Sequence, residues 1–317
     1  MRRLFLAPAL AALSLIAAPA GAQQVVDPDF RPRVERPAYA ADGPVVVIDG
    51  AHRNFHTVDG QYAPFAALLR ADGYRVRAGT LAFDAGGLEG VDVMVIANAG
   101  ATQQQPTPPA FTEAEATALE AWVREGGRLL LIADHAPFGA AAETLAARFG
   151  LRMGTGYAFA LTDGGADLTT TLVYPAEAFG SHPIFAGRDA SERVDSVTAF
   201  TGQSLAGPEG ATVLLHMTDG ARESPDLPTL QALVQRLDDA GAPAAVVAEL
   251  SQPALPAQGL AFTHGAGRVV VLGEAGMLSA QRVRFPDGRE VRFGMNVAPG
   301  NAQFGLNILH WLTGLLP

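Results

Sequence analysis

Ionisable and amide side chains stand directly after the longest apolar runs of this chain. The run VVVID at 45–49 is followed by two histidines that are four residues apart, His52 and His56. Other such runs are followed at once by an amide, a carboxylate or a histidine. Histidine and carboxylate groups transfer protons near neutral pH and bind divalent metals. The set comprises Asp49, His52, Asn54, His56, Asn98, Asp134, His135 and Glu274.

These residue types support two kinds of site. In an enzyme, His135 or His56 would be the general base, and Glu274 or Asp134 would be the acid or the orienting group. A divalent metal is an optional cofactor of that enzyme, and its candidate ligands are His52, His56, His135 and Glu274. In a binding module without turnover, the hydrogen-bonding candidates are His52, Asn54, Asn98, Thr201 and Gln203.

Each candidate also has a structural interpretation, and the sequence leaves both open. An aspartate at the end of a strand, such as Asp49 or Asp134, often caps the following turn or helix. A histidine in a loop, such as His52, is more often exposed or hydrogen-bonded than a ligand. Glu274 is harder to explain structurally, because a carboxylate directly after a buried strand needs a partner or solvent.

These side chains can meet only if the apolar runs belong to one sheet. Continuous apolar runs predict strands covered on both faces, and helical spacing with a capping box at Thr112 and Glu115 predicts helices between them. The predicted strands are 44–50, 74–79, 91–97 and 128–133, and the predicted helices are 60–73, 111–125 and 137–149. This alternation indicates βαβ units on a parallel sheet, where ligands bind beyond the carboxyl ends of the strands.

The pattern changes after about residue 153. Residues 153–240 are rich in glycine and weakly periodic, so we expect a loop-rich excursion that includes a hairpin. Within it, the segment 225–243 is either a short helix or a loop. Apolar runs return at 211–217, 244–250 and 268–277, and helical spacing returns at 301–316. We expect residues 44–317 to form a single domain.

The N-terminal segment has the pattern of a secretory signal. Two arginines, an apolar stretch and the small residues Ala20-Gly21-Ala22 follow one another, so we predict a signal peptide at 1–22 with cleavage before Gln23. Residues 23–43 contain three prolines and no periodicity, and we expect an extended linker there. The expected location is periplasmic or secreted, with no stable membrane anchor after cleavage.

The composition excludes several kinds of chemistry. The chain contains no cysteine, which removes disulfides and thiolate catalysis, and no lysine, which removes Schiff-base catalysis. Its formal net charge of −10 disfavours nucleic acid as a partner. Neither a phosphate-binding glycine motif nor a G-x-S-x-G elbow occurs, so nucleotide binding and the common serine hydrolase mechanism are also disfavoured.

The order of these motifs resembles the class I glutamine amidotransferase-like superfamily. The resemblance covers roughly residues 44–150 and 267–315, and it is carried by VVVIDGAH, VDVMVIANAG, FTEAEATALEAWVREGGRLLLIADH and NAQFGLNILHWLTG. Within the superfamily, the chain is most similar to a secreted bacterial family of unassigned function that lacks the catalytic cysteine. The resemblance implies a flavodoxin-like, class I amidotransferase-like three-layer sandwich with a mostly parallel sheet.

The resemblance places the site but removes the superfamily's best-known chemistry. Its amidotransferases carry a nucleophilic cysteine at the elbow between a strand and a helix, where this chain has Asp134 and His135. Thiol-based glutamine hydrolysis is therefore excluded. We expect instead a hydrolase or lyase that acts on a small or carbohydrate-like molecule by acid/base or metal-assisted chemistry. The alternative is a non-catalytic periplasmic ligand-binding module.

Overall fold

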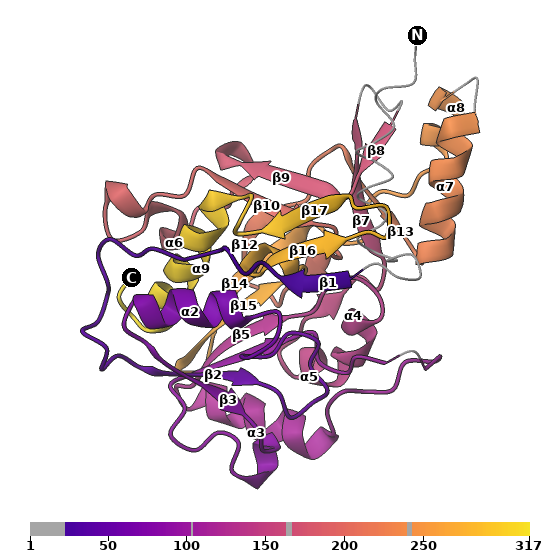
Figure 1. Cartoon of the computed structure of the whole chain (residues 1–317). Helices are drawn as coiled ribbons and strands as arrows, with labels where there is room; N and C mark the ends of the chain where they lie inside the picture. Colours follow the sequence, from indigo (N-terminus) through magenta and orange to yellow (C-terminus); the bar gives the residue numbers. More distant parts are fainter. Residues whose placement is uncertain (1–22, 103, 163–166, 240–242) are drawn as a thin grey trace.

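A nine-stranded sheet forms the centre of the computed structural model, which describes residues 23–102, 104–162, 167–239 and 243–317 (Figure 1). Its parallel strands are, in spatial order, β3 (Arg75–Gly79), β2 (Val45–Asp49), β4 (Val93–Ala97), β5 (Arg128–Ile132) and β15 (Gly267–Leu272). Antiparallel strands continue the sheet from β15: β14 (Ala257–His264), β12 (Thr212–His216), β11 (Leu205–Ala206) and β6 (Arg152–Met153). The chain is thus a mixed α/β protein with a sheet that is parallel at its core, as the sequence predicts.

Helices cover the two faces of the parallel strands. Val46 and Ile48 of β2 share a hydrophobic core with Phe65 and Phe304, whereas Val47 between them belongs to a second core with Leu119. The helices of the first core are α2 (Ala63–Ala71) and α9 (Pro299–Leu312), and those of the second are α3 (Glu113–Arg124) and α5 (Glu143–Arg148). Because successive side chains of a strand point to opposite faces, an unbroken apolar run is what two covered faces require.

The start of α3 follows from local chemistry. The capping box is confirmed, since the Thr112 hydroxyl accepts a hydrogen bond from the Glu115 amide at 3.2 Å and the Glu115 carboxylate accepts one from the Thr112 amide at 2.9 Å. The helix expected at 137–149 is divided into α4 (Phe138–Ala141) and α5. In the described part of the chain, no helix is long and apolar enough to span a bilayer. The signal peptide expected at 1–22 lies outside the described residues.

The described residues of 153–240 are not loop-rich, so that expectation is wrong for them. A three-stranded sheet contains β7 (Tyr157–Thr162), β8 (Asp167–Thr169) and β13 (Ala221–Ser224), and a two-stranded sheet contains β9 (Thr171–Pro175) and β10 (Ser196–Phe200). Of the segment 225–243, Leu227–Asp239 form the helix α7, and the apolar run at 244–250 lies largely in α8 (Pro243–Ala248). Figure 1 shows α7 and α8 side by side next to β13. Phe159, Leu230 and Leu233 belong to the small core that holds this unit together.

The extended linker expected at 23–43 begins with a strand that belongs to the fold. Strand β1 (Gln23–Val26) pairs antiparallel with β16 (Ala280–Arg284), which pairs in turn with β17 (Glu290–Gly294) (Figure 1). Asp27, directly after β1, is buried and forms ion pairs with Arg282 and Arg292. A four-residue strand whose partner lies more than 250 positions away leaves no periodic signal of its own.

Candidate functional site

A cavity of about 540 Å³ lies where the parallel strands end. His56 follows β2, Asn98 follows β4, Asp134 and His135 follow β5, and Glu274 follows β15, and all five residues line the cavity. The register explains the convergence, because Ile132 pairs with Ala97 on one side and with Leu272 on the other. The volume is in the range of small-molecule sites.

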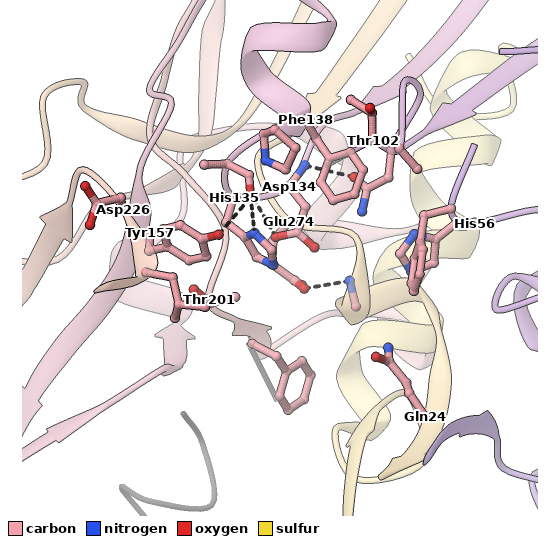
Figure 2. A pocket seen from close by; sticks show the side chains of 18 of the residues that line it. Gln24, His56, Thr102, Asp134, His135, Phe138, Tyr157, Thr201, Asp226 and Glu274 are labelled. Carbon is pink, nitrogen blue, oxygen red and sulfur yellow. Dashed lines mark hydrogen bonds between the residues drawn. The ribbon is translucent and has the colours of Figure 1, made fainter. Parts of the chain in front are cut away.

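The structure brings six of the nine residues that we singled out as candidates for catalysis or binding to this cavity. The six are His56, Asn98, Asp134, His135, Thr201 and Glu274, and Figure 2 shows most of them around the cavity. His52, Asn54 and Gln203 are not among its lining residues. Asn54 donates to the Ala97 carbonyl at 3.4 Å, and Gln203, fully buried, donates to the Ala133 carbonyl at 2.8 Å, so both brace the backbone behind the cavity.

His52 bridges two carboxylates away from the cavity. Its Nδ1 lies 2.8 Å from Asp49 Oδ2, and its Nε2 lies 2.8 Å from Glu115 Oε1. Burial opposes protonation of the ring, but the hydrogen bonds and charges of Asp49 and Glu115 outweigh it and raise the pKa of His52. Both ring nitrogens are therefore occupied, which leaves none for the ligand or the metal that the sequence assigned to this residue.

Backbone hydrogen bonds next to this bridge join the two loops that form one wall of the cavity. The Gly100 and Ala101 amides donate to the His52 and Arg53 carbonyls at 2.8 and 3.0 Å, and the Phe55 amide donates to the Asn98 carbonyl at 3.0 Å. These bonds join the segment after β2 to the segment after β4. As a result, Phe55, His56, Asn98, Ala101 and Thr102 line the cavity together.

Two lining residues adopt backbone conformations that non-glycine residues rarely adopt. Asn98 has a φ of 51° and Thr201 a φ of 105°. Side-chain bonds hold both in place: the Asn98 Oδ1 accepts from the Asp134 amide at 2.9 Å, and the Thr201 hydroxyl donates to the Ala158 carbonyl at 3.0 Å. Strain of this kind costs on the order of 1–3 kcal/mol per residue and is concentrated at functional sites.

His56 is buried without a hydrogen-bond partner. Only 3% of the residue is exposed, its ring lies 4.7 Å from that of Tyr62, and neither ring nitrogen has a partner among the described residues. Burial, together with the nearby charge of His135, lowers the pKa of His56 to about 3. The ring is therefore neutral at neutral pH, with one nitrogen that can donate and one that can accept.

Glu274 is a buried acid beside a second carboxylate. Its Oε1 accepts from the Gly276 amide at 2.6 Å and its Oε2 accepts from the Met277 amide at 2.7 Å. Burial and the charge of Asp134 nevertheless raise the pKa of Glu274 well above its ordinary value, because they outweigh these bonds. Asp134 itself accepts from the His135 amide at 2.8 Å. The surroundings of Glu274 thus favour the protonated acid.

His135 presents a free ring nitrogen at the edge of the cavity. Its Nδ1 lies 2.8 Å from the Ala136 carbonyl, which can only accept, so Nδ1 carries the proton and the neutral ring keeps its lone pair on Nε2 (Figure 2). The Tyr157 hydroxyl donates to the same carbonyl at 3.0 Å, and the Tyr157 ring stacks on the imidazole at a centroid distance of 4.5 Å. The half-buried ring is thereby oriented with its basic nitrogen unpaired among the described residues.

The sequence did not single out several lining residues. Phe55 stands between His52 and His56, but a single phenylalanine at that place does not indicate a function. Phe138 lies in the helix predicted at 137–149, and the others come from the segments that we expected to be a linker or loops and from the β16–β17 hairpin. Besides Phe55, these lining residues include Gln24, Phe138, Tyr157, Phe200, Asp226, Gln281 and Phe293. Gln24 of β1 donates to Gln281 of β16 at 2.7 Å, so the N-terminal strand itself contributes to the wall.

The metal-ligand set proposed from the sequence does not come together. Within the described ranges, no three histidine, aspartate or glutamate side chains are grouped so that they could hold a metal ion. Of the four candidate ligands, His52 is engaged by its two carboxylates, and Glu274 is bonded to the backbone of its own turn.

Comparison with known proteins supports the fold alone. No protein-family model and no curated protein matches the chain. Among solved structures, the mmIFT52 N-terminal domain is similar with a TM-score of 0.52 at 13% identity, over 85% of this chain and 97% of that one. A putative ThuA-like protein from Bacteroides uniformis (TM-score 0.42, 13% identity, 90% and 95% covered) and a cytoplasmic protein from Salmonella typhimurium (0.41, 12%, 85% and 99%) are more distant neighbours.

Replacing His52 with alanine should destabilise the protein strongly. The change leaves Asp49 and Glu115 buried without the ring between them, and breaking a buried ion pair costs about 3–5 kcal/mol. Chemical denaturation at pH 7 measures the loss in free energy of unfolding. His216→Ala, at an exposed position, is the control and should change that free energy by less than about 0.5 kcal/mol. Equal stability of the two variants would contradict a structural role for His52.

Replacing His56 with glutamine should reduce the sensitivity of the fold to acid. The unfolded ring binds a proton below its ordinary pKa of 6.5, whereas the folded ring does so only near 3, so stability falls as the pH falls through this window. The ring accounts for about 2 kcal/mol of the stability lost between pH 7 and pH 5. Melting temperatures of wild type, His56→Gln and the exposed control His216→Gln measure this. Parallel curves for all three would show that His56 is not the acid-sensitive group.

Proposed function

We propose that this protein is an acid/base enzyme, a hydrolase or lyase, that acts on a small or carbohydrate-like molecule bound in the cavity. One observation carries the proposal: His135 offers a free basic nitrogen and Glu274 a carboxyl group whose protonated form is favoured, and both line the same cavity. General acid–base catalysis needs two such groups in opposite protonation states.

The surroundings divide the catalytic roles among the residues. His135 is the better base, because the low pKa of His56 makes that ring a weak proton acceptor. His135 Nε2 would take a proton from water or from the substrate, and Glu274 would give its proton to the leaving group. Asp134 orients the pair, since its carboxylate accepts from the His135 amide and its charge keeps Glu274 protonated.

The proposed fold is more specific than the mixed α/β architecture shared with the similar solved structures. We propose a flavodoxin-like, class I amidotransferase-like three-layer sandwich, supported by helices on both faces of the parallel strands and by a cavity at the carboxyl ends of these strands. Asp134 and His135 stand between β5 and α4, at the position where the superfamily's amidotransferases carry a cysteine. With no cysteine in the chain, thioester chemistry has no nucleophile.

The proposed location is the periplasm or the extracellular space. It is supported by the signal-like pattern at 1–22, and the acidic composition supports a small-molecule partner rather than a nucleic acid. No metal is part of the proposed mechanism, because the candidate ligands do not form a group among the described residues.

A second candidate function is ligand binding without turnover. It is favoured by the two backbone bonds to Glu274, which use its carboxylate oxygens to form the turn after β15. In that case the unpartnered His56 and the amide of Asn98 would bind the ligand, and Glu274 would be structural.

A substrate-pool screen with matched variants distinguishes the two functions. We expect wild type to convert a pool member, and His135→Ala and Glu274→Gln each to lower its kcat by about 10²–10⁴-fold. His216→Ala and Glu209→Gln remove an exposed histidine and an exposed carboxylate and should retain activity. Melting temperatures show whether each variant is folded. A ligand that raises the melting temperature of wild type and His135→Ala equally, with no turnover by either, would show a binding module instead.

A further inference from the structure

We propose that the cavity selects a molecule that carries a protonated primary amine on an apolar or aromatic body. This ligand class belongs to the same cavity, and it rests on the proposed function because that function places the substrate there. It is carried by the charge, the hydrogen-bonding groups and the aromatic rings that the described residues place around one space.

The charged groups of the lining are carboxylates. Asp134 and Asp226 line the cavity as carboxylates, Glu274 lines it as the protonated acid described above, and no arginine is among the described lining residues. The chain contains no lysine at all, so the two histidines are the only basic side chains of this lining. Such a lining repels carboxylate or phosphate ligands, because no fixed positive charge is present to pair with them.

The burial of His56 is an independent sign of a ligand. A polar group withdrawn from water without a partner is destabilising, and the described residues provide no hydrogen bond to either ring nitrogen of His56. The ring lies on the opposite side of the cavity from Tyr157 (Figure 2). An ammonium group has three donors and no acceptor. It therefore suits an accepting imidazole nitrogen on one side and the carboxylate of Asp134 on the other.

Aromatic rings form much of the remaining wall. Phe55, Phe138, Tyr157, Phe200 and Phe293 all line the cavity, and Phe55 stands at the surface with 40% of its area exposed. Ring faces attract cations and also pack against apolar or aromatic bodies. A ligand with a charged head and an apolar body can use both properties of this lining.

The carboxyl groups near the cavity also act on the tyrosines around it. Burial raises the pKa of Tyr157, and the charges of Asp134 and Asp226 raise it further. Tyr62 responds in the same direction, through burial and then through Glu274 and Asp134. A neutral hydroxyl ligand would leave this charge as it is, whereas a bound ammonium group would offset it.

Three probes of similar size but different charge test the proposal on the wild-type protein. Benzylamine is a cation at pH 7, benzyl alcohol is neutral, and benzoate is an anion. Isothermal titration calorimetry should show benzylamine binding at least about tenfold more tightly than benzyl alcohol, with no binding of benzoate. Benzyl alcohol or benzoate binding as tightly as benzylamine would overturn the proposal, and so would the absence of binding by all three.

A pair of charge-matched variants shows where the cation binds. Asp134→Asn should weaken benzylamine binding at least about tenfold and leave benzyl alcohol binding unchanged. Asp84→Asn removes an exposed carboxylate outside the lining and should change neither. Equal loss in both variants would overturn the assignment to the cavity. The wild-type comparison does not depend on whether Asp134→Asn folds.

The binding experiment and the substrate screen can fail independently of each other. A neutral substrate whose turnover requires His135 would overturn the amine preference and leave the proposed enzyme intact. Selective benzylamine binding without turnover of any amine in the pool would support the amine preference and count against catalysis.

Discussion

The register of the parallel strands is the constraint on which the site depends. Ile132 pairs with Ala97 of β4 and with Leu272 of β15, so three strands end at the same level of the sheet. The chain that leaves each strand must carry its polar groups into the same space, whatever the distance between the strands in the sequence. Cores on both faces hold this register, because a slip by one residue would turn the apolar side chains of a strand toward the wrong face.

His52 and His56 lie four residues apart in the same loop but have opposite surroundings. His52 has a carboxylate at each ring nitrogen, and its pKa is raised. His56 has no partner at either nitrogen, and its pKa is lowered. The first ring ties the end of β2 to the N-terminus of α3, and the second is free to meet a ligand. The bonds of His52 thus help to hold His56 at the cavity, because both histidines lie on the segment that is hydrogen-bonded to residues 98–101.

Much of the cavity wall comes from segments for which the sequence did not predict the strands that form there. Gln24 of β1 and Gln281 of β16 belong to one small sheet and Tyr157 of β7 belongs to another, yet all three line the cavity. The residues at the strand ends supply the ionisable groups, and these added sheets supply most of the aromatic and amide surface. This division is common in open α/β proteins, in which a rigid sheet positions the chemistry and the surrounding segments shape the pocket.

The sequence alone determined the strands and helices of residues 44–150, the capping box at Thr112 and the gathering of polar residues at one sheet edge, because these depend on local periodicity and on the geometry of parallel strands. It also excluded thiol and Schiff-base chemistry through composition. Only the tertiary structure decided that His52 is bridged while His56 is not, and that β1 belongs to the fold. The partners in these cases are 63 positions away for Glu115 and 257 for Gln281, and contacts over such distances leave no pattern near either residue.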